Sequence, residues 1–203
     1  MSELEKGERR LDEFFTLHHE HMWEQTIEKS RFIGWAYPVA SLADVAEGLQ
    51  RSRALWPAAR HYVYAWRLWT DQREKSSDDG EPQGTGGRPV LDALQFKGLW
   101  NVLVIVARYF GGVLLGTGGL TRAYGGTARA LLNEAQIIQR MTMAACTLHV
   151  PYALFETLKY QLQSRGREIA QSEFAADVRL EIHIPVREKE SFAQWLREAW
   201  HGQ

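Results

Sequence analysis

The chain has 203 residues, of which 45% are hydrophobic and 24% are charged, and its formal net charge is −1. This composition is typical of a folded protein and excludes the disordered and fibrous classes. The near-neutral charge excludes a protein that binds nucleic acid through bulk positive charge, so a polyanion can be held only by a local patch.

The location of the protein is indicated by three features of the sequence. No stretch approaches the roughly 18 consecutive apolar residues of a membrane span. The first fifteen residues are highly charged and lack the apolar core of a signal peptide. The single cysteine, Cys146, can form no internal disulfide and offers no metal cluster. We therefore expect a cytoplasmic protein without a membrane partner.

The first part of the chain alternates apolar segments with polar turns. Ser41 and Asp44 have the spacing of a capping box, which predicts the start of a helix. The unbroken apolar run at 102–107 is typical of a strand that is buried on both faces. The predicted elements, in chain order, are strands 23–27 and 32–39, a helix from Ser41, a strand 60–68, a loop 71–87, a short helix near Pro89, a strand 102–107, a glycine loop 109–119 and a helix 120–139.

From Met141 onward glycine becomes rare and alternating strands return. The order strand, helix, strand, strand, helix is that of a small ferredoxin-like domain whose last strand is missing or hidden. We therefore predict an α+β protein with an N-terminal domain at 1–140 and a ferredoxin-like domain at 141–203. The predicted elements of the second domain are strand 147–150, helix 152–164, strand 167–172, strand 178–185 and helix 188–200.

Most of the 17 glycines lie between Gly80 and Gly126, in and around two loops. The first loop is an acidic turn that contains Asp78, Asp79 and Glu81. These carboxylates could hold Mg²⁺, which prefers oxygen ligands, or contact a cationic partner, or accept hydrogen bonds from nearby amides. Asp and Gly also build tight turns without any ligand, so the acidic turn alone does not decide between these interpretations.

The second loop joins a buried strand to the start of a helix. This arrangement predicts an anion site, because free amides and the helix dipole both face the loop. The loop has neither the Gly-Lys-Ser/Thr ending of a Walker A loop nor the spacing of the dinucleotide fingerprint. The candidate binding residues here are Arg108, Tyr109, Gly111, Gly112, Gly116, Thr117, Gly118, Gly119, Arg122 and Tyr124.

Two arginines support the anion hypothesis. Arg122 lies in the first predicted turn of the helix, where acidic residues are usual, and Arg108 lies at the end of the strand. A bound phosphate would reverse the unfavourable interaction of Arg122 with the helix dipole. Alternatively, either arginine pairs with Asp78, Asp79 or Glu81 and ties the two loops together.

The strand 60–68 carries Tyr62, Tyr64 and Trp66 on one face. Such aromatics can stack on nucleic-acid bases, although a core beneath a helix is the more common arrangement. His61, on the other face, fits a hydrogen-bonded structural histidine better than a catalytic base. No known catalytic motif occurs in the sequence, which disfavours an enzyme without excluding one.

Several motifs, in the same order along the chain, resemble the IMPACT/YigZ family. They cover about residues 20 to 135 and are Lys29-Ser30-Arg31-Phe32-Ile33, His61 with Ala65-Trp66, Ser77-Asp78-Asp79-Gly80-Glu81-Pro82 with Gly84-Thr85-Gly86, and the segment 106–126 (VARYFGGVLLGTGGLTRAYGG). The resemblance implies an N-terminal left-handed βαβ domain, a two-layer fold similar to domains of a ribosomal protein, elongation factor G and the GHMP kinases. It also implies a C-terminal ferredoxin-like domain.

The resemblance further implies an association with translation. Eukaryotic relatives are translation regulators, but their second domain is different, so their partner is not carried over. We expect a non-enzymatic binding protein that contacts the ribosome, RNA or a translation factor through its glycine-rich surface, with no cofactor and no DNA partner. The alternative is an enzyme or sensor for a small phosphorylated ligand, which would use the glycine loop for phosphate and the acidic turn for Mg²⁺ or acid–base chemistry.

Overall fold

The computed structural model describes residues 12–200, which form two compact units. The larger unit is Phe14–Arg140, and the smaller one contains residues 12–13 together with 141–200. Among the helices of these described residues, none combines the length and the apolar character that a membrane span requires.

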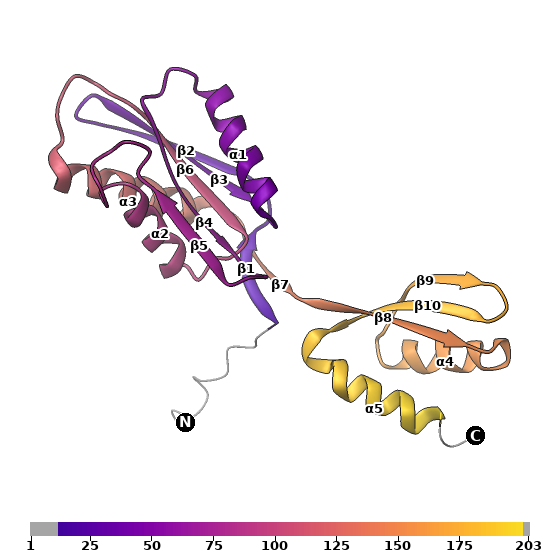
Figure 1. The fold of residues 1–203 in the computed structure, drawn as a ribbon. Coiled ribbons are helices and arrows are strands. Elements are labelled where there is room, and N and C mark those ends of the chain that lie inside the picture. Colours follow the sequence, from indigo (N-terminus) through magenta and orange to yellow (C-terminus); the bar gives the residue numbers. More distant parts are fainter. Residues whose placement is uncertain (1–11, 201–203) are drawn as a thin grey trace, which may run out of the picture. The chain divides into compact units, whose positions relative to one another are not determined.

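The larger unit is built on a five-stranded sheet with the order β2-β3-β6-β4-β5 (Figure 1). Every pair of neighbouring strands in it is antiparallel. Because β3 and β4 both pair with β6, they run parallel to each other, and the helix α1 connects them in a βαβ unit. The strands are β2 (His21–Ile27), β3 (Ser30–Pro38), β4 (His61–Leu68), β5 (Arg73–Ser77) and β6 (Val102–Tyr109).

Helices cover both faces of this sheet (Figure 1). On one face, α1 (Leu42–Leu55) packs against a core that includes Tyr62 and Trp66, so these aromatics of β4 belong to the core. On the other face lie α2 (Gly87–Phe96) and α3 (Gly116–Glu134). The domain therefore has a helical layer on each side of the sheet, one layer more than the two that the resemblance implies.

The central strand β6 is buried from Val102 to Arg108, as its apolar run predicts. Ser41 caps α1 with the predicted capping box: its side chain accepts from the amide of Asp44, and Asp44 accepts from the amide of Ser41. Local capping and apolar periodicity therefore specify the parts of the domain that support the sheet.

The predicted loop at 71–87 contains the strand β5, which the sequence pattern does not predict. β5 consists of the polar residues REKSS, and it pairs with β4 at the edge of the sheet. An edge strand needs backbone partners on one side only and has little apolar surface to bury, so its sequence lacks the usual strand pattern.

The helix predicted at 120–139 runs from Gly116 to Glu134 in the structure. The low helix propensity of glycine suggested that Gly116 and Gly118 belong to the loop, yet they form the first turn of α3. After the helix, β7 (Ile137–Met141) pairs with β1 (Glu13–Leu17) in a separate two-stranded sheet.

The smaller unit has a three-stranded antiparallel sheet with the order β8-β10-β9. Leu158 and Leu162 of α4 and Phe192 of α5 pack with one face of β10 to form its core. The element order is the ferredoxin-like one that the sequence predicts, and within residues 12–200 no fourth strand joins this sheet. Its elements are β8 (Met143–Val150), α4 (Tyr152–Ser164), β9 (Ile169–Phe174), β10 (Val178–Pro185), the 3₁₀ turn η2 (Val186–Glu188) and α5 (Lys189–Trp200).

The glycine loop at 110–115 packs against the turn between β2 and β3. The amide of Gly111 donates to Ser30 Oγ at 3.2 Å, and a Cβ at Gly111 would lie 2.0 Å from the carbonyl carbon and oxygen of Lys29. By contrast, a Cβ at Gly118 would meet nothing closer than the Arg122 guanidinium at 3.5 Å. Gly111 is therefore required for close backbone packing, whereas Gly118 is not.

We expect Gly111→Ala and Gly118→Ala to change stability in opposite directions. The Gly111 variant forces two backbone segments apart, so its free energy of unfolding should fall by about 1–3 kcal/mol or more. Gly118 lies in a helical turn of the folded protein, and alanine there reduces the backbone freedom of the unfolded chain. The free energy of unfolding of this variant should therefore rise by up to about 0.5–1 kcal/mol. Urea unfolding followed by circular dichroism measures both. A Gly111→Ala variant as stable as the wild type would contradict the packing described above.

Candidate functional site

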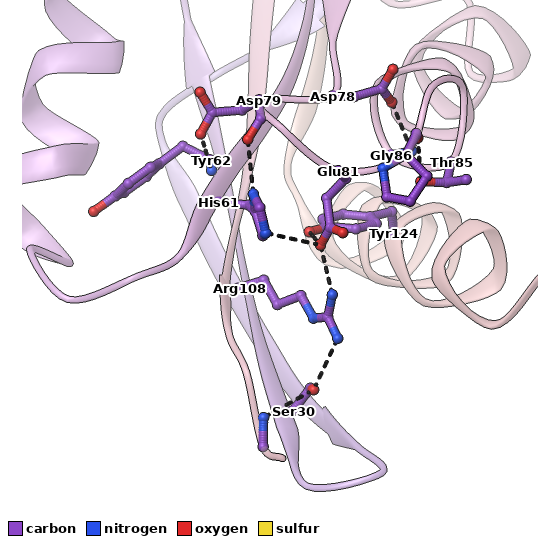
Figure 2. Close-up of polar contacts among 12 residues, drawn as sticks. Ser30, His61, Tyr62, Asp78, Asp79, Glu81, Thr85, Gly86, Arg108 and Tyr124 are labelled. Carbon is purple, nitrogen blue, oxygen red and sulfur yellow. Dashed lines mark hydrogen bonds and ion pairs between the residues drawn. The ribbon is translucent and has the colours of Figure 1, made fainter. Parts of the chain in front are cut away.

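The acidic turn and the glycine-rich segment meet at one end of the five-stranded sheet (Figure 2). Glu81 comes from the acidic turn, Arg108 from the end of β6, and Tyr124 from α3. Ser30 at the start of β3 and His61 at the start of β4 join them. Because β6 is antiparallel to both strands, its last residues lie beside the first residues of β3 and β4.

Glu81 is the centre of a buried polar network. Its Oε1 accepts hydrogen bonds from Arg108 Nη1 and from the Tyr124 hydroxyl, each at 2.7 Å (Figure 2). The side chains of Arg108 and Glu81 are only 6% and 4% exposed. Burial, and then the hydrogen bond to Glu81, raises the pKa of Tyr124 far above its ordinary value, so the phenol stays protonated and donates.

Arg108 is therefore occupied by the protein itself. The sequence left open whether it binds an anion or pairs with the acidic turn, and the structure shows the ion pair with Glu81. A second guanidinium nitrogen, Nη2, donates to Ser30 Oγ at 3.3 Å. Arg108, Glu81 and Tyr124, all predicted as binding residues, lie in the interior and would meet a partner only if this network opened.

His61 lies beside the same network and bonds the acidic turn through one ring nitrogen. Its Nδ1 lies 2.8 Å from the backbone oxygen of Asp79, an acceptor, so Nδ1 carries a proton in this contact. Its Nε2 lies 3.9 Å from Glu81 Oε1. His61 thus connects the acidic turn to β4, which agrees with its interpretation as a structural histidine.

Asp78 uses its carboxylate to hold the start of α2. Its Oδ1 accepts from the amides of Gly86 and Gly87 at 2.9 and 2.8 Å, and its Oδ2 accepts from the amide of Gly84 at 2.8 Å. Burial acts to raise the pKa of Asp78, but the amides of Gly84, Gly87 and Gly86 outweigh it and hold the pKa below its ordinary value. The protein thus supplies its own anion to the N-terminus of α2.

Asp79 also has partners within the domain. Its Oδ2 accepts from the amide of Tyr62 at 2.6 Å, and its Oδ1 lies 3.2 Å from Arg53 Nη2. All three carboxylates of the acidic turn are thus engaged by groups of the chain itself. Within residues 12–200, no group of three or more His, Cys, Asp and Glu side chains is placed to hold a metal ion.

The other predicted residues lie at or near the surface around the first turn of α3. This turn has no side-chain cap and no acidic residue. Leu114, just before it, is 87% exposed. Tyr109, Gly111 and Gly119 are half-buried, whereas the exposed predicted residues are Gly112, Gly116, Thr117, Gly118 and Arg122. The structure therefore separates the predicted set into a buried network and an exposed surface.

Neither Ser30 nor the proximity of His61 to Glu81 is predicted by the sequence. Ser30 is fully buried and bonds both Arg108 and Gly111, although it lies in a polar turn that looks solvent-exposed in the sequence. The one signal available was that Ser30 and His61 both fall in the motifs that carry the family resemblance.

We expect Arg108→Met to destabilise the protein by about 3–5 kcal/mol, because it leaves the Glu81 carboxylate buried without its charge partner. Adding Glu81→Gln should recover at least half of that loss, since the double variant buries no charge. Arg31→Met, which removes an exposed pair with Glu24, should cost less than about 1 kcal/mol. Chemical unfolding of the four proteins measures these differences. Equal losses for Arg108→Met and Arg31→Met would disprove the central role of the buried pair.

We expect Asp78→Asn to cost about 1–3 kcal/mol at neutral pH, because one amide donor would face a side-chain NH₂ group. The folded pKa of Asp78 is lowered, so its contribution is present above its ordinary value of 3.8 and is lost as the pH falls through the folded pKa. The stability difference between wild type and variant should therefore shrink in acid below that value. Asp71→Asn, at an exposed position, is the control. A difference that stays constant from neutral to acid pH would contradict this role.

Two family descriptions match the chain. Residues 28–132 match the Impact N-terminal domain, which spans the whole site described above. Residues 148–203 match a domain of unknown function, DUF1949.

Relatives match over nearly the full chain. IMPACT family member YvyE of Bacillus subtilis is 30% identical over 194 residues, which are 95% of this chain and 89% of the relative. IMPACT family member YigZ of Escherichia coli is 32% identical over 181 residues, 88% of this chain and 89% of the relative. A solved structure described as "Crystal structure of an hypothetical protein" is 30% identical, covers 95% of both chains and has a TM-score of 0.69. On these matches, the chain belongs to the IMPACT family.

Proposed function

We propose that the protein is a cytoplasmic, non-enzymatic binding protein that acts in translation and contacts ribosomal RNA through the exposed start of α3. The contact surface consists of Gly112, Leu114, Gly116, Thr117, Gly118 and Arg122, and is called the α3 surface below. The observation that carries the proposal is that this helix N-terminus has no side-chain cap and no carboxylate, while a cation, Arg122, is exposed beside it.

The comparison with α2 supports an anionic partner. Both helices follow glycine-rich loops, but the amides at the start of α2 already hold the carboxylate of Asp78. The first turn of α3 has no equivalent group. A cation near a helix N-terminus costs about 0.3–1 kcal/mol, and a phosphate bound between the amides and Arg122 would turn this cost into a gain.

The buried network supports the α3 surface from below. Ser30 holds Gly111 at the start of the loop, and Glu81 holds Tyr124 in α3. These bonds fix both ends of the segment that carries the α3 surface. A surface that is already ordered loses little conformational entropy when it binds.

Membership of the IMPACT family supports the link to translation, since the resemblance described for its motifs implies such an association. The acidic turn offers less support for an enzyme that handles a phosphorylated ligand. Asp78, Asp79 and Glu81 each have partners within the domain, so Mg²⁺ binding or acid–base work would require one of them to give up its present contacts.

We expect the purified protein to pellet with ribosomes in a saturable manner that weakens as salt increases. Arg122→Glu should weaken this binding and lower the salt dependence by about one counterion, because it removes a phosphate contact. Arg197→Glu, which makes the same charge change at an exposed position of α5, should bind like the wild type. Co-sedimentation across a salt series, with ribosomes and with separated subunits, measures both variants.

Three results of this experiment are informative. Pelleting that survives removal of RNA by nuclease would indicate a protein partner instead of RNA. Equal weakening by Arg122→Glu and Arg197→Glu would show that net charge, and not the α3 surface, controls binding. No pelleting at low salt would reject the proposal.

A further inference from the structure

The smaller unit leaves one long strand edge without a partner. β8 pairs with β10 from Met143 to Val150 along one side, and within residues 12–200 no strand pairs with its other side. In a complete ferredoxin-like sheet the closing strand would lie there. The outward-facing amides and carbonyls of such an edge are a template for another strand.

The two edges of this sheet differ in how they are protected. Natural edge strands avoid unwanted pairing through charged side chains, proline or bulges. β9, at the other edge, has an irregular register opposite Glu181 and Ile182 and carries Glu173. β8 has the sequence MAACTLHV, which contains no proline and no Lys, Arg, Asp or Glu. The edge of β8 therefore lacks the features that prevent strand addition.

The side chains of β8 that face the core are incompletely covered. Ala144, Cys146 and Leu148 pack against the core but are only half-buried. On the neighbouring strand β10, Leu180 and Ile182 are fully buried. A strand added beside β8 would extend the sheet over the same core and cover this remaining apolar surface.

We propose that β8 pairs antiparallel with β8 of a second copy of this chain, which joins the two small sheets into one. Residues directly opposite each other in antiparallel strands face the same side of the sheet. A two-fold axis at Cys146 then places Ala144 opposite Leu148 on the core face and Ala145 opposite Thr147 on the open face. No like charges meet, and a small side chain lies opposite a large one, so β8 is complementary to itself.

The test measures the mass of the full chain by light scattering. The wild type should be a dimer, and Ala145→Lys with Thr147→Lys should be a monomer, because the new lysines lie opposite each other across the axis. The β8–β10 pairing should persist, since Thr147 lies opposite Glu181. Ala170→Lys with Gln171→Lys adds the same charge to β9 and should remain a dimer.

Cys146, the single cysteine of the chain, reports the register. Opposite residues have Cα atoms about 4.5–5.5 Å apart, which lies within the range that a disulfide can bridge. Mild oxidation should therefore give a covalent dimer that is lost in Cys146→Ala. If the axis lies at Thr147 instead, Cys146→Ala with Thr147→Cys should cross-link, and this result also supports pairing through β8.

Three outcomes would overturn the proposal. The wild type could be a monomer at every concentration, which would leave the edge to a strand of another protein. The lysine variant of β8 could stay a dimer, or a dimer could form without a cross-link at either position. Both results would place the contact between copies elsewhere on the chain.

Discussion

The ion pair between Arg108 and Glu81 determines how the end of the larger unit that carries the candidate site is built. Both side chains are buried, and a charge in that environment is stable only while its partner and hydrogen bonds are present. Through this pair, the end of the central strand holds the acidic turn, and the same carboxylate holds Tyr124 of α3. Ser30 extends the network to the β2–β3 turn. Segments that are far apart in the sequence are thus ordered by one carboxylate.

The two glycine-rich segments both lead into a helix, but the N-termini of these helices differ in whether the chain supplies an anion. Each leads into a helix whose first amides lack partners within the helix. In α2 the chain itself supplies an anion, because Asp78 lies just upstream and folds back onto Gly86 and Gly87. In α3 the first turn contains Gly116, Thr117 and Gly118 and no acidic residue. The N-terminus of α2 therefore has a carboxylate of the chain as its anion, whereas the first turn of α3 has none.

Sequence patterns predicted the elements that depend on apolar burial or local capping. The run at 102–107 predicted β6, the capping box at Ser41 predicted α1, and the element order predicted the ferredoxin-like unit. They failed at two places: β5 is polar because it is an edge strand, and α3 begins at Gly116, although the low helix propensity of glycine favours a later start. The motifs indicated that the acidic turn and the glycine loop could be joined by an arginine. Spacing alone could not decide whether Arg108 pairs with a carboxylate or faces an anion.

The position of β6 has a consequence for the order in which the domain assembles during its synthesis. The hairpins β2–β3 and β4–β5 are complete early and can form from local contacts, but they do not pair with each other. They are joined only by β6, the last of the five strands to leave the ribosome. Until then, the aromatic residues of β3 and β4 lack the strand that completes their core. The newly made chain therefore exposes apolar surface over a long interval, and the sheet forms late and through distant contacts.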